Sequence, residues 1–200
     1  MNTEILRPTS SAGFARAAAI IRSGALVAFP TETVYGLGAN GLDAAACARI
    51  YAAKGRPSDN PLILHIADLS MAYEIARKVP PTAAHLLTAF APGPLTVILP
   101  KAAHIPDIVT GGLATVGIRC PDHDVARKLI RAAGVPIAAP SANTSGRPSP
   151  TSAAMVYADM AGRIPLILDG GSCRLGVESA IVDCTEGDIV TILRPGAVTR

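Results

Sequence analysis

The chain has 200 residues, enough for one full hydrophobic core, and half of them are apolar while only 16% are charged, which excludes an intrinsically disordered chain. A net charge of +3 is too small to indicate a polyanion-binding protein by itself. No apolar run reaches the roughly 18 residues of a membrane span and residues 1–11 lack a signal-peptide core, so no membrane contact and a cytoplasmic location are expected.

The first third of the chain predicts two strands with a helix between them. Residues 9–24 read as a helix with a capping hydroxyl at its start and Gly24 at its end. A buried strand follows over 25–30, a polar loop over 31–41, a helix over 43–53 and a second strand over 62–66. The strand, helix, strand order predicts a parallel pair with a right-handed crossover.

The remaining elements continue this alternation and end in a hairpin. They are helices over 70–78 and 82–90, strands over 95–100 and 114–119, a helix over 122–133, a strand over 136–140, a helix over 151–160, a strand over 166–169, and two hairpin strands over 180–184 and 189–193. With no internal repeat or linker, residues 1–200 are expected to form a single α/β domain with a twisted mixed sheet and helices on its faces. Polar loops follow several strands, so a ligand crevice is expected at strand ends.

Several common motifs can be set aside. The glycines at 36, 38 and 41 match GxGxxG, but five residues separate the first of them from the preceding strand, where a dinucleotide fingerprint needs an immediate tight turn. No P-loop, no GxSxG elbow and no metal-binding spacing are present, and the four scattered cysteines read as reduced thiols. His85 reads as a core or boundary residue, whereas the position of His65 fits either a core or a cleft.

Residues 54–66, KGRPSDNPLILHI, form the stretch densest in chemistry, which reads either as a ligand loop or as a stiff surface connection. Further cations and hydroxyls follow at strand ends: Arg119, Ser141, Asn143, Arg147 and Arg194. Brought together, such groups would suit a triphosphate, because fixed cations offset its charge. The alternative is that the arginines pair with Asp59, Asp169 or Glu178.

Seven stretches in order resemble the YrdC/Sua5 family of threonylcarbamoyl-AMP synthases: FPTETVYGLGAN (29–40), KGRPSDNPLILHI (54–66), PGPLTVIL (92–99), VGIRCPDH (116–123), APSANTSGRPSPT (139–151), GVESAIVD (176–183) and ILRPGAV (192–198). The resemblance implies a YrdC-like fold with a large basic concave cavity. It also implies ATP-dependent joining of L-threonine and bicarbonate or CO2 into L-threonylcarbamoyl-AMP, with release of pyrophosphate, to supply the t6A modification of tRNA.

The resemblance also assigns residues. It places ATP at Lys54, Arg56, Asn60, Thr115, Ser141, Asn143, Ser149 and Arg194, and threonine at Thr31, Thr33, Tyr35, His65, Arg119 and Ser179. Lys54 and Arg56 would serve catalysis by positioning and charge stabilisation, and the planar fork of Arg119 suits a carboxylate. Mg²⁺ is expected through the triphosphate, without a protein metal site.

The expected partners are the substrates and the downstream t6A-forming proteins, with weak binding of tRNA or double-stranded RNA in addition. Two other functions stay open: a non-catalytic RNA-binding module with a basic concave face, and a carbamoyl-adenylate-forming domain of the kind found in hydrogenase maturation. Long family members carry a second domain after the LRPG segment, so the chain is expected to be either a short form or the N-terminal part of a longer protein.

Overall fold

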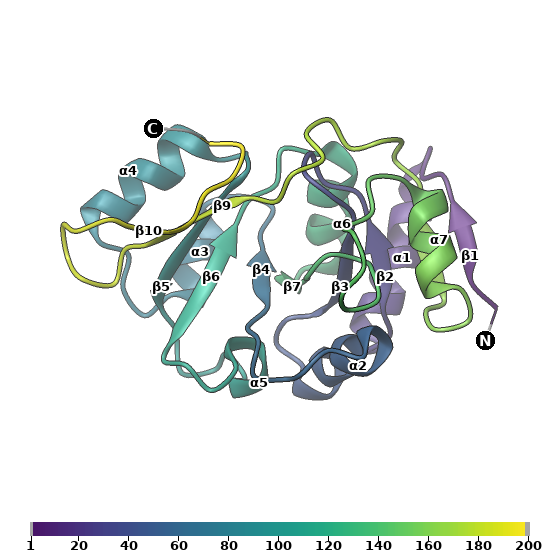
Figure 1. Ribbon diagram of the computed structural model, residues 1–200, viewed down its shortest axis with the longest axis horizontal. Coiled ribbons are helices and arrows are strands. Elements are labelled where there is room, and N and C mark those ends of the chain that lie inside the picture. Colours follow the sequence, from purple (N-terminus) through teal and green to yellow (C-terminus); the bar gives the residue numbers. More distant parts are fainter. Residues whose placement is uncertain (1, 199–200) are drawn as a thin grey trace.

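The computed structural model describes residues 2–198 and shows helices packed around one mixed sheet (Figure 1). The helices are α1 (Ser11–Arg22), α2 (Ala44–Lys54), α3 (Ser70–Ile75), α4 (Pro81–Phe90), α5 (Asp107–Thr110), α6 (Asp124–Ala133) and α7 (Ala153–Met160). The strands are β1 (Glu4–Leu6), β2 (Val27–Phe29), β3 (Gly36–Asn40), β4 (Ile63–His65), β5 (Leu95–Pro100), β6 (Thr115–Arg119), β7 (Ile137–Ala138), β8 (Leu166–Leu168), β9 (Ala180–Asp183) and β10 (Thr191–Arg194).

The sheet order is β1-β8-β2-β3-β7-β4-β6-β5-β9-β10, which confirms the mixed α/β class. The predicted hairpin is also confirmed, because β9 and β10 pair antiparallel. Their register shifts between Ile192 and Arg194, so β10 carries a bulge.

Capping residues determine where helices α2 and α6 begin and where α2 ends. The Asp43 carboxylate accepts hydrogen bonds from the amides of Ala45 and Ala46 at the start of α2, and Gly55 ends that helix in the left-handed conformation at φ 62°. Helix α6 begins two residues later than predicted, at Asp124, because the His123 imidazole accepts from the amide of Val125 and acts as its cap.

The prediction of a loop over 31–41 is corrected, since the second half of this region is strand β3. This strand pairs antiparallel with β2, and its glycines permit close packing: a Cβ on Gly38 would lie 2.8 Å from the side chains of Ile137 and Phe29. The GxGxxG pattern therefore reflects strand packing. The predicted parallel pairing of β2 with β4 is wrong as well, because β2 pairs with β3 and β8 while β4 pairs with β6 and β7.

Smaller differences concern short or exposed elements. The prediction missed β1 and α5, which have only three and four residues. His85 is exposed on α4, against the expectation of a core or boundary position, because the buried face of that helix is formed by Ala83 and Leu87. Cys47, Cys120 and Cys184 are buried and Cys173 is half-buried, all as free thiols, as expected.

Two clusters of buried apolar side chains hold these elements together. One spans α2, α3, α4 and most strands, and the other packs Ala17, Ala18 and Ile21 of α1 and Leu129 and Ile130 of α6 on β2 and β8. Within residues 2–198, no helix has both the length and the apolar character needed to cross a membrane.

Candidate active site

A cavity of about 300 Å³ lies over one face of the central strands. Its floor uses alternate residues of each strand, namely Ile63 and His65 of β4, Thr96 and Ile98 of β5, and Gly117 and Arg119 of β6. Residues two apart on a strand share a face. The crevice therefore lies over the sheet face, and the polar loops that follow β2 and β7 also line it, as expected for loops at strand ends.

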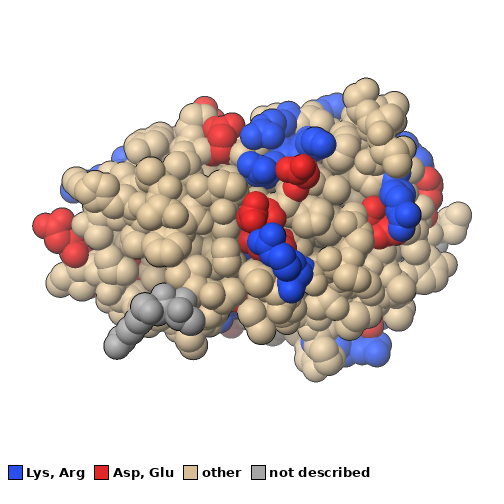
Figure 2. Space-filling view, turned by 90° about the horizontal axis from the view of Figure 1, so that it is seen from above, with Lys and Arg blue, Asp and Glu red and all other residues tan. Residues whose placement is uncertain are grey.

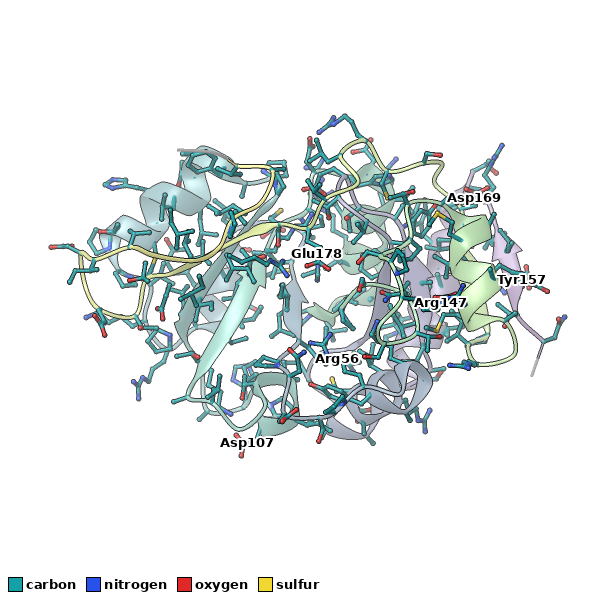
Figure 3. The ribbon with its side chains drawn as sticks, viewed as in Figure 1. Arg56, Asp107, Arg147, Tyr157, Asp169 and Glu178 are labelled. Carbon is teal, nitrogen blue, oxygen red and sulfur yellow. The ribbon has the colours of Figure 1, made fainter. Side chains whose placement is uncertain are left out.

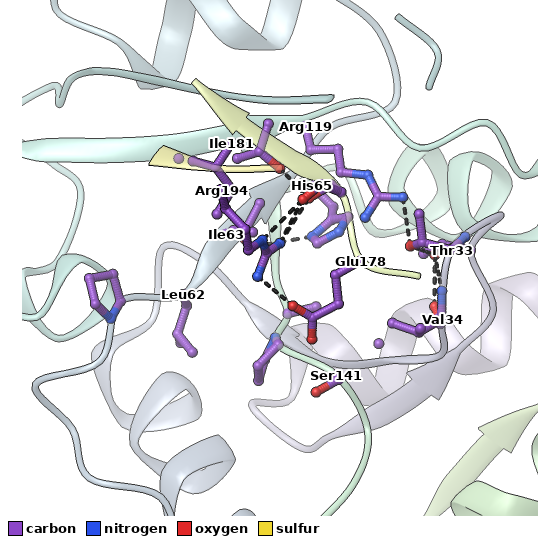
Figure 4. A pocket seen from close by; sticks show the side chains of 18 of the residues that line it. Thr33, Val34, Leu62, Ile63, His65, Arg119, Ser141, Glu178, Ile181 and Arg194 are labelled. Atoms are coloured by element: carbon purple, nitrogen blue, oxygen red, sulfur yellow. Dashed lines mark hydrogen bonds and ion pairs between the residues drawn. The ribbon is translucent and has the colours of Figure 1, made fainter. Parts of the chain in front are cut away.

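Loops from distant parts of the sequence form the walls. Arg56 and Asn60 follow α2, Ser141 follows β7, and Glu178 precedes β9. Figure 3 shows Arg56 and Glu178 in the middle of the molecule, and Figure 4 shows Glu178, Arg194, Arg119 and Thr33 around one pocket. Gly36 forms a bridge with Ser141, which fixes the loop after β7 beside β3.

Arg119 forms the inner end of the cavity and is held on two sides. Its Nη2 lies 2.9 Å from Oε1 of Glu32 and donates to the Thr33 hydroxyl at 2.9 Å, while its Nε donates to the carbonyl of Gly93 at 3.4 Å. The side chains of Arg119 and Glu32 are only 5% and 1% exposed. Among residues 2–198, no hydrogen bond uses Nη1 of Arg119, which leaves that nitrogen able to bind an anion.

His65 lies directly opposite Arg119 in the β4–β6 register. Burial, together with the Arg119 charge, lowers the pKa of His65 to about 3, so the imidazole is neutral near pH 7. Its Nδ1 lies 3.2 Å from the carbonyl of Ile63, and a carbonyl only accepts, so Nδ1 carries the hydrogen in this contact.

Arg194 and Glu178 form a second ion pair at the outer end of the cavity, and Figure 4 draws the contact between them. Nε and Nη2 of Arg194 also donate to the carbonyl of Ser179 at 3.1 and 2.9 Å. The Ser149 hydroxyl donates to Oε1 of Glu178 at 3.2 Å. Here the alternative weighed from the sequence, an arginine paired with Glu178, is found inside the candidate site.

Lys54 ends α2 and is 2% exposed. Its Nζ donates to the carbonyls of Ser141 and Asn143 at 2.5 and 2.6 Å and contacts Oδ1 of Asn143 at 3.4 Å. Burial, with a smaller contribution from the Arg56 charge, lowers the pKa of Lys54 to about 8.

The cavity brings together most of the residues predicted for ATP and threonine. Those that line it are Thr31, Thr33, Arg56, Asn60, His65, Arg119, Ser141, Ser179 and Arg194. Lys54 and Asn143 lie behind Ser141, and Ser149 contacts the cavity through Glu178.

Two predicted residues point elsewhere. Tyr35 is buried and its hydroxyl donates to the carbonyl of Gly171, and Thr115 pairs with Pro100 at the opposite end of β6 from Arg119. Arg147, beside α7 in Figure 3, pairs with Asp159.

Sequence reasoning gave no role to Glu32 and missed Thr96 as part of the cavity floor. The two glutamates that pair with site arginines, Glu32 and Glu178, both lie inside motifs of the family resemblance, FPTETVYG and GVESAIVD. A carboxylate between two threonines reads as a solvated loop residue, so the burial of Glu32 gave no sequence signal. The strand pattern LTVIL does place Thr96 and Ile98 on one face of the strand. It does not indicate which face of the sheet is open to the cavity.

The charge of the cavity is mixed. Arg56, Arg119 and Arg194 line it together with Glu178, so the expected basic character stays a prediction. From above, Figure 2 shows cations and anions side by side over the middle of the molecule, without a continuous basic patch on that face. Residues 2–198 contain no group of three potential protein ligands for a metal ion.

The chain is similar to a known protein family and to named proteins over most of its length. The Sua5/YciO/YrdC family model, described as telomere recombination, matches residues 19–196. The threonylcarbamoyl-AMP synthase of Pyrococcus abyssi is 56% identical over 91% of this chain and 53% of its own length, and that of Bacillus subtilis is 53% identical over 96% and 56%.

Among solved structures, P. abyssi Sua5 in complex with L-threonine superposes with a TM-score of 0.92 at 51% identity, over 98% of this chain and 57% of that one. The chain thus spans about half the length of these relatives. The match to the family model and the identities to both synthases show that this chain belongs to the Sua5/YciO/YrdC family.

Proposed function

We propose that residues 1–200 carry the catalytic domain of an L-threonylcarbamoyl-AMP synthase, which uses ATP, L-threonine and bicarbonate or CO2. The observation that carries this proposal is one cavity with a firmly held arginine, Arg119, at its inner end and two further arginines, Arg56 and Arg194, at its outer end. A carboxylate substrate and a polyphosphate need such separate cationic ends. The relatives above, named for this activity, support the same choice.

At the inner end, Arg119 would bind the threonine carboxylate through Nη1, since its other nitrogens are held by the protein. The hydroxyls of Thr31 and Thr33 and the neutral His65 surround the same region and offer partners for the amine and the hydroxyl. The Ser179 hydroxyl accepts from Nη2 of Arg194 at 3.2 Å and so lies toward the outer end. A relative with this fold has been solved in complex with L-threonine, which supports threonine as a ligand of this fold.

At the outer end, Arg56, Asn60, Ser141 and Arg194 would bind ATP. The threonine nitrogen attacks CO2 and loses a proton to give a carbamate. A carbamate oxygen then attacks the α-phosphorus of ATP, the bond to the bridging oxygen breaks, and pyrophosphate leaves. Arg56 and Arg194 would stabilise the charge that builds on the phosphates, so the protein acts by position and electrostatics without a covalent intermediate.

Mg²⁺ would arrive with the triphosphate. Glu178 is the one carboxylate that lines the cavity in the described part of the chain, and it is paired with Arg194. These residues do not fit a protein cage for the ion, which commonly keeps phosphate and water ligands. The product would pass to t6A-forming proteins, and the need for ATP supports a cytoplasmic location.

Incubation of the protein with ATP, Mg²⁺, bicarbonate and threonine tests the proposal. We expect threonine-dependent release of pyrophosphate and a product with the mass of threonylcarbamoyl-AMP. Release equal to that of the control without threonine would contradict it.

The RNA-binding module receives less support, because many surface cations are already paired, as in Arg7–Asp169, Arg147–Asp159 and Arg174–Asp122. RNA binding that is steeply dependent on salt, in a protein that binds no ATP, would favour that function instead.

A further inference from the structure

Lys54 is tied to the loop 141–147 by every donor it has. An ammonium group carries three hydrogens, and three acceptors surround Nζ: the carbonyls of Ser141 and Asn143 and the side-chain oxygen of Asn143. The side chain is almost fully buried and does not line the cavity. A phosphate could reach this ammonium only if at least one of these contacts were broken.

The main chain strengthens the same connection. The amide of Ser145 donates to the carbonyl of Lys54 at 2.9 Å, so the last residue of α2 holds the loop at two places. Within the loop, the side-chain Nδ2 of Asn143 donates to the carbonyls of Thr144 and Arg147 at 3.0 and 2.7 Å, which closes the loop on itself. Ser141, at the start of the loop, lines the cavity.

We propose that Lys54 is a positioning residue whose ammonium group fixes the loop 141–147, and thereby Ser141, and that it does not contact the triphosphate. The loop function follows from contacts of the protein alone, whereas the statement about ATP rests on the proposed function. Arg56, two residues later, lines the cavity and is the cation of this segment that would meet the phosphates.

Hydrogen exchange of the ligand-free protein tests the loop function with Lys54→Met, which keeps a long side chain but removes all donors. Amides of residues 141–147 should exchange roughly tenfold faster, as expected when a charged hydrogen-bond anchor is lost. Lys101→Met is the matched control, because Lys101 donates to the carbonyl of Ile105 and pairs with Asp107. It should loosen residues 102–107 and leave 141–147 unchanged. Unchanged exchange of 141–147 in Lys54→Met would overturn the proposal.

Affinity for adenosine and for ATP separates positioning from phosphate contact. For Lys54→Met, the affinities for both ligands should fall by a similar factor, whereas Arg56→Met should weaken ATP alone. A loss confined to ATP in Lys54→Met would overturn the proposal. If the wild-type protein bound neither ligand, the proposed function would fail, while the exchange experiment would still decide the role of Lys54.

Amine acetylation of the wild-type protein, read by mass spectrometry, covers the case in which Lys54→Met does not fold. Lys54 should stay unmodified with or without ATP, while Lys128, which is exposed on α6, reacts in both conditions. Modification of Lys54 that ATP suppresses would show a phosphate contact and overturn the proposal.

Discussion

Two arginine–glutamate pairs occupy the two ends of the cavity, and they differ mainly in burial. The side chains of Arg119 and Glu32 are 5% and 1% exposed, whereas those of Arg194 and Glu178 are 36% and 42% exposed. Breaking a buried pair leaves an uncompensated charge in a medium of low polarity, while water screens the partners of an exposed pair. The inner pair therefore belongs to the scaffold, and the outer pair can exchange its partner for a ligand.

Glu32→Gln should have the largest effect, because it leaves Arg119 buried without a counter-charge. We expect the free energy of unfolding to fall by about 3 kcal/mol. Where the variant still folds, KM for threonine should rise far more than KM for ATP, since Arg119 loses its orientation. Chemical denaturation and steady-state kinetics measure both, and an unchanged midpoint with unchanged threonine KM would show that the pair does not hold the scaffold.

Arg194→Met removes the outer cation and should act on ligand binding more than on stability. Loss of a charged hydrogen bond to phosphate should weaken ATP binding by about 2 kcal/mol, while the unfolding midpoint changes little. Calorimetric titration with ATP measures this. A large loss of stability with normal ATP affinity would place Arg194 in the scaffold and remove the contrast between the two pairs.

Acid should destabilise the inner end through His65. Its pKa is lowered to about 3 in the folded protein, against about 6.5 in an unfolded chain, so between these values the unfolded state binds the extra proton. The stabilisation that comes from keeping His65 neutral is fully present above pH 6.5. Below that pH, the free energy of unfolding should fall by about 1 kcal/mol for each pH unit. In denaturation measured at several pH values, His65→Asn should flatten this dependence. His85→Asn should keep it, because His85 is exposed on α4.

Glu178→Gln should have the smallest effect on stability, below about 1 kcal/mol, because its pair with Arg194 is screened by water. Its effect on binding should be favourable, since ATP no longer competes with a carboxylate for Arg194. A tighter Kd for ATP in the variant would support partner exchange. A weaker one would mean that Glu178 helps to hold the nucleotide.

Local signals predicted much of this fold, and long-range geometry supplied the rest. Asp43 and Gly55 bound α2 as caps do in general, and the apolar runs around TEGD gave the β9–β10 hairpin. Strand β3 was missed because its glycines resemble a loop, and they are tolerated only because Phe29 and Ile137 pack where side chains would stand. Which strands become neighbours depends on contacts over long sequence separations, which no local pattern contains.

The candidate site shows the same division. Motif resemblance named residues that the cavity does bring together, such as Arg56, His65 and Arg119. It could not separate Lys54, whose donors all face the protein, from Arg56, which faces the cavity. Burial of Glu32 was equally hidden, because it results from the packing of segments far apart in the sequence.

The bulge in β10 has a consequence for how the chain tolerates changes in length. Arg194 pairs with Ile181, a cavity residue, only because Leu193 is the extra residue in the ladder. In an unbulged ladder of the same sequence, Leu193 would stand opposite Ile181 and the arginine would turn to the other face. Insertions or deletions within the β9–β10 ladder are thus constrained by the phase of one side chain, whereas a change of length in the exposed turn leaves that phase intact.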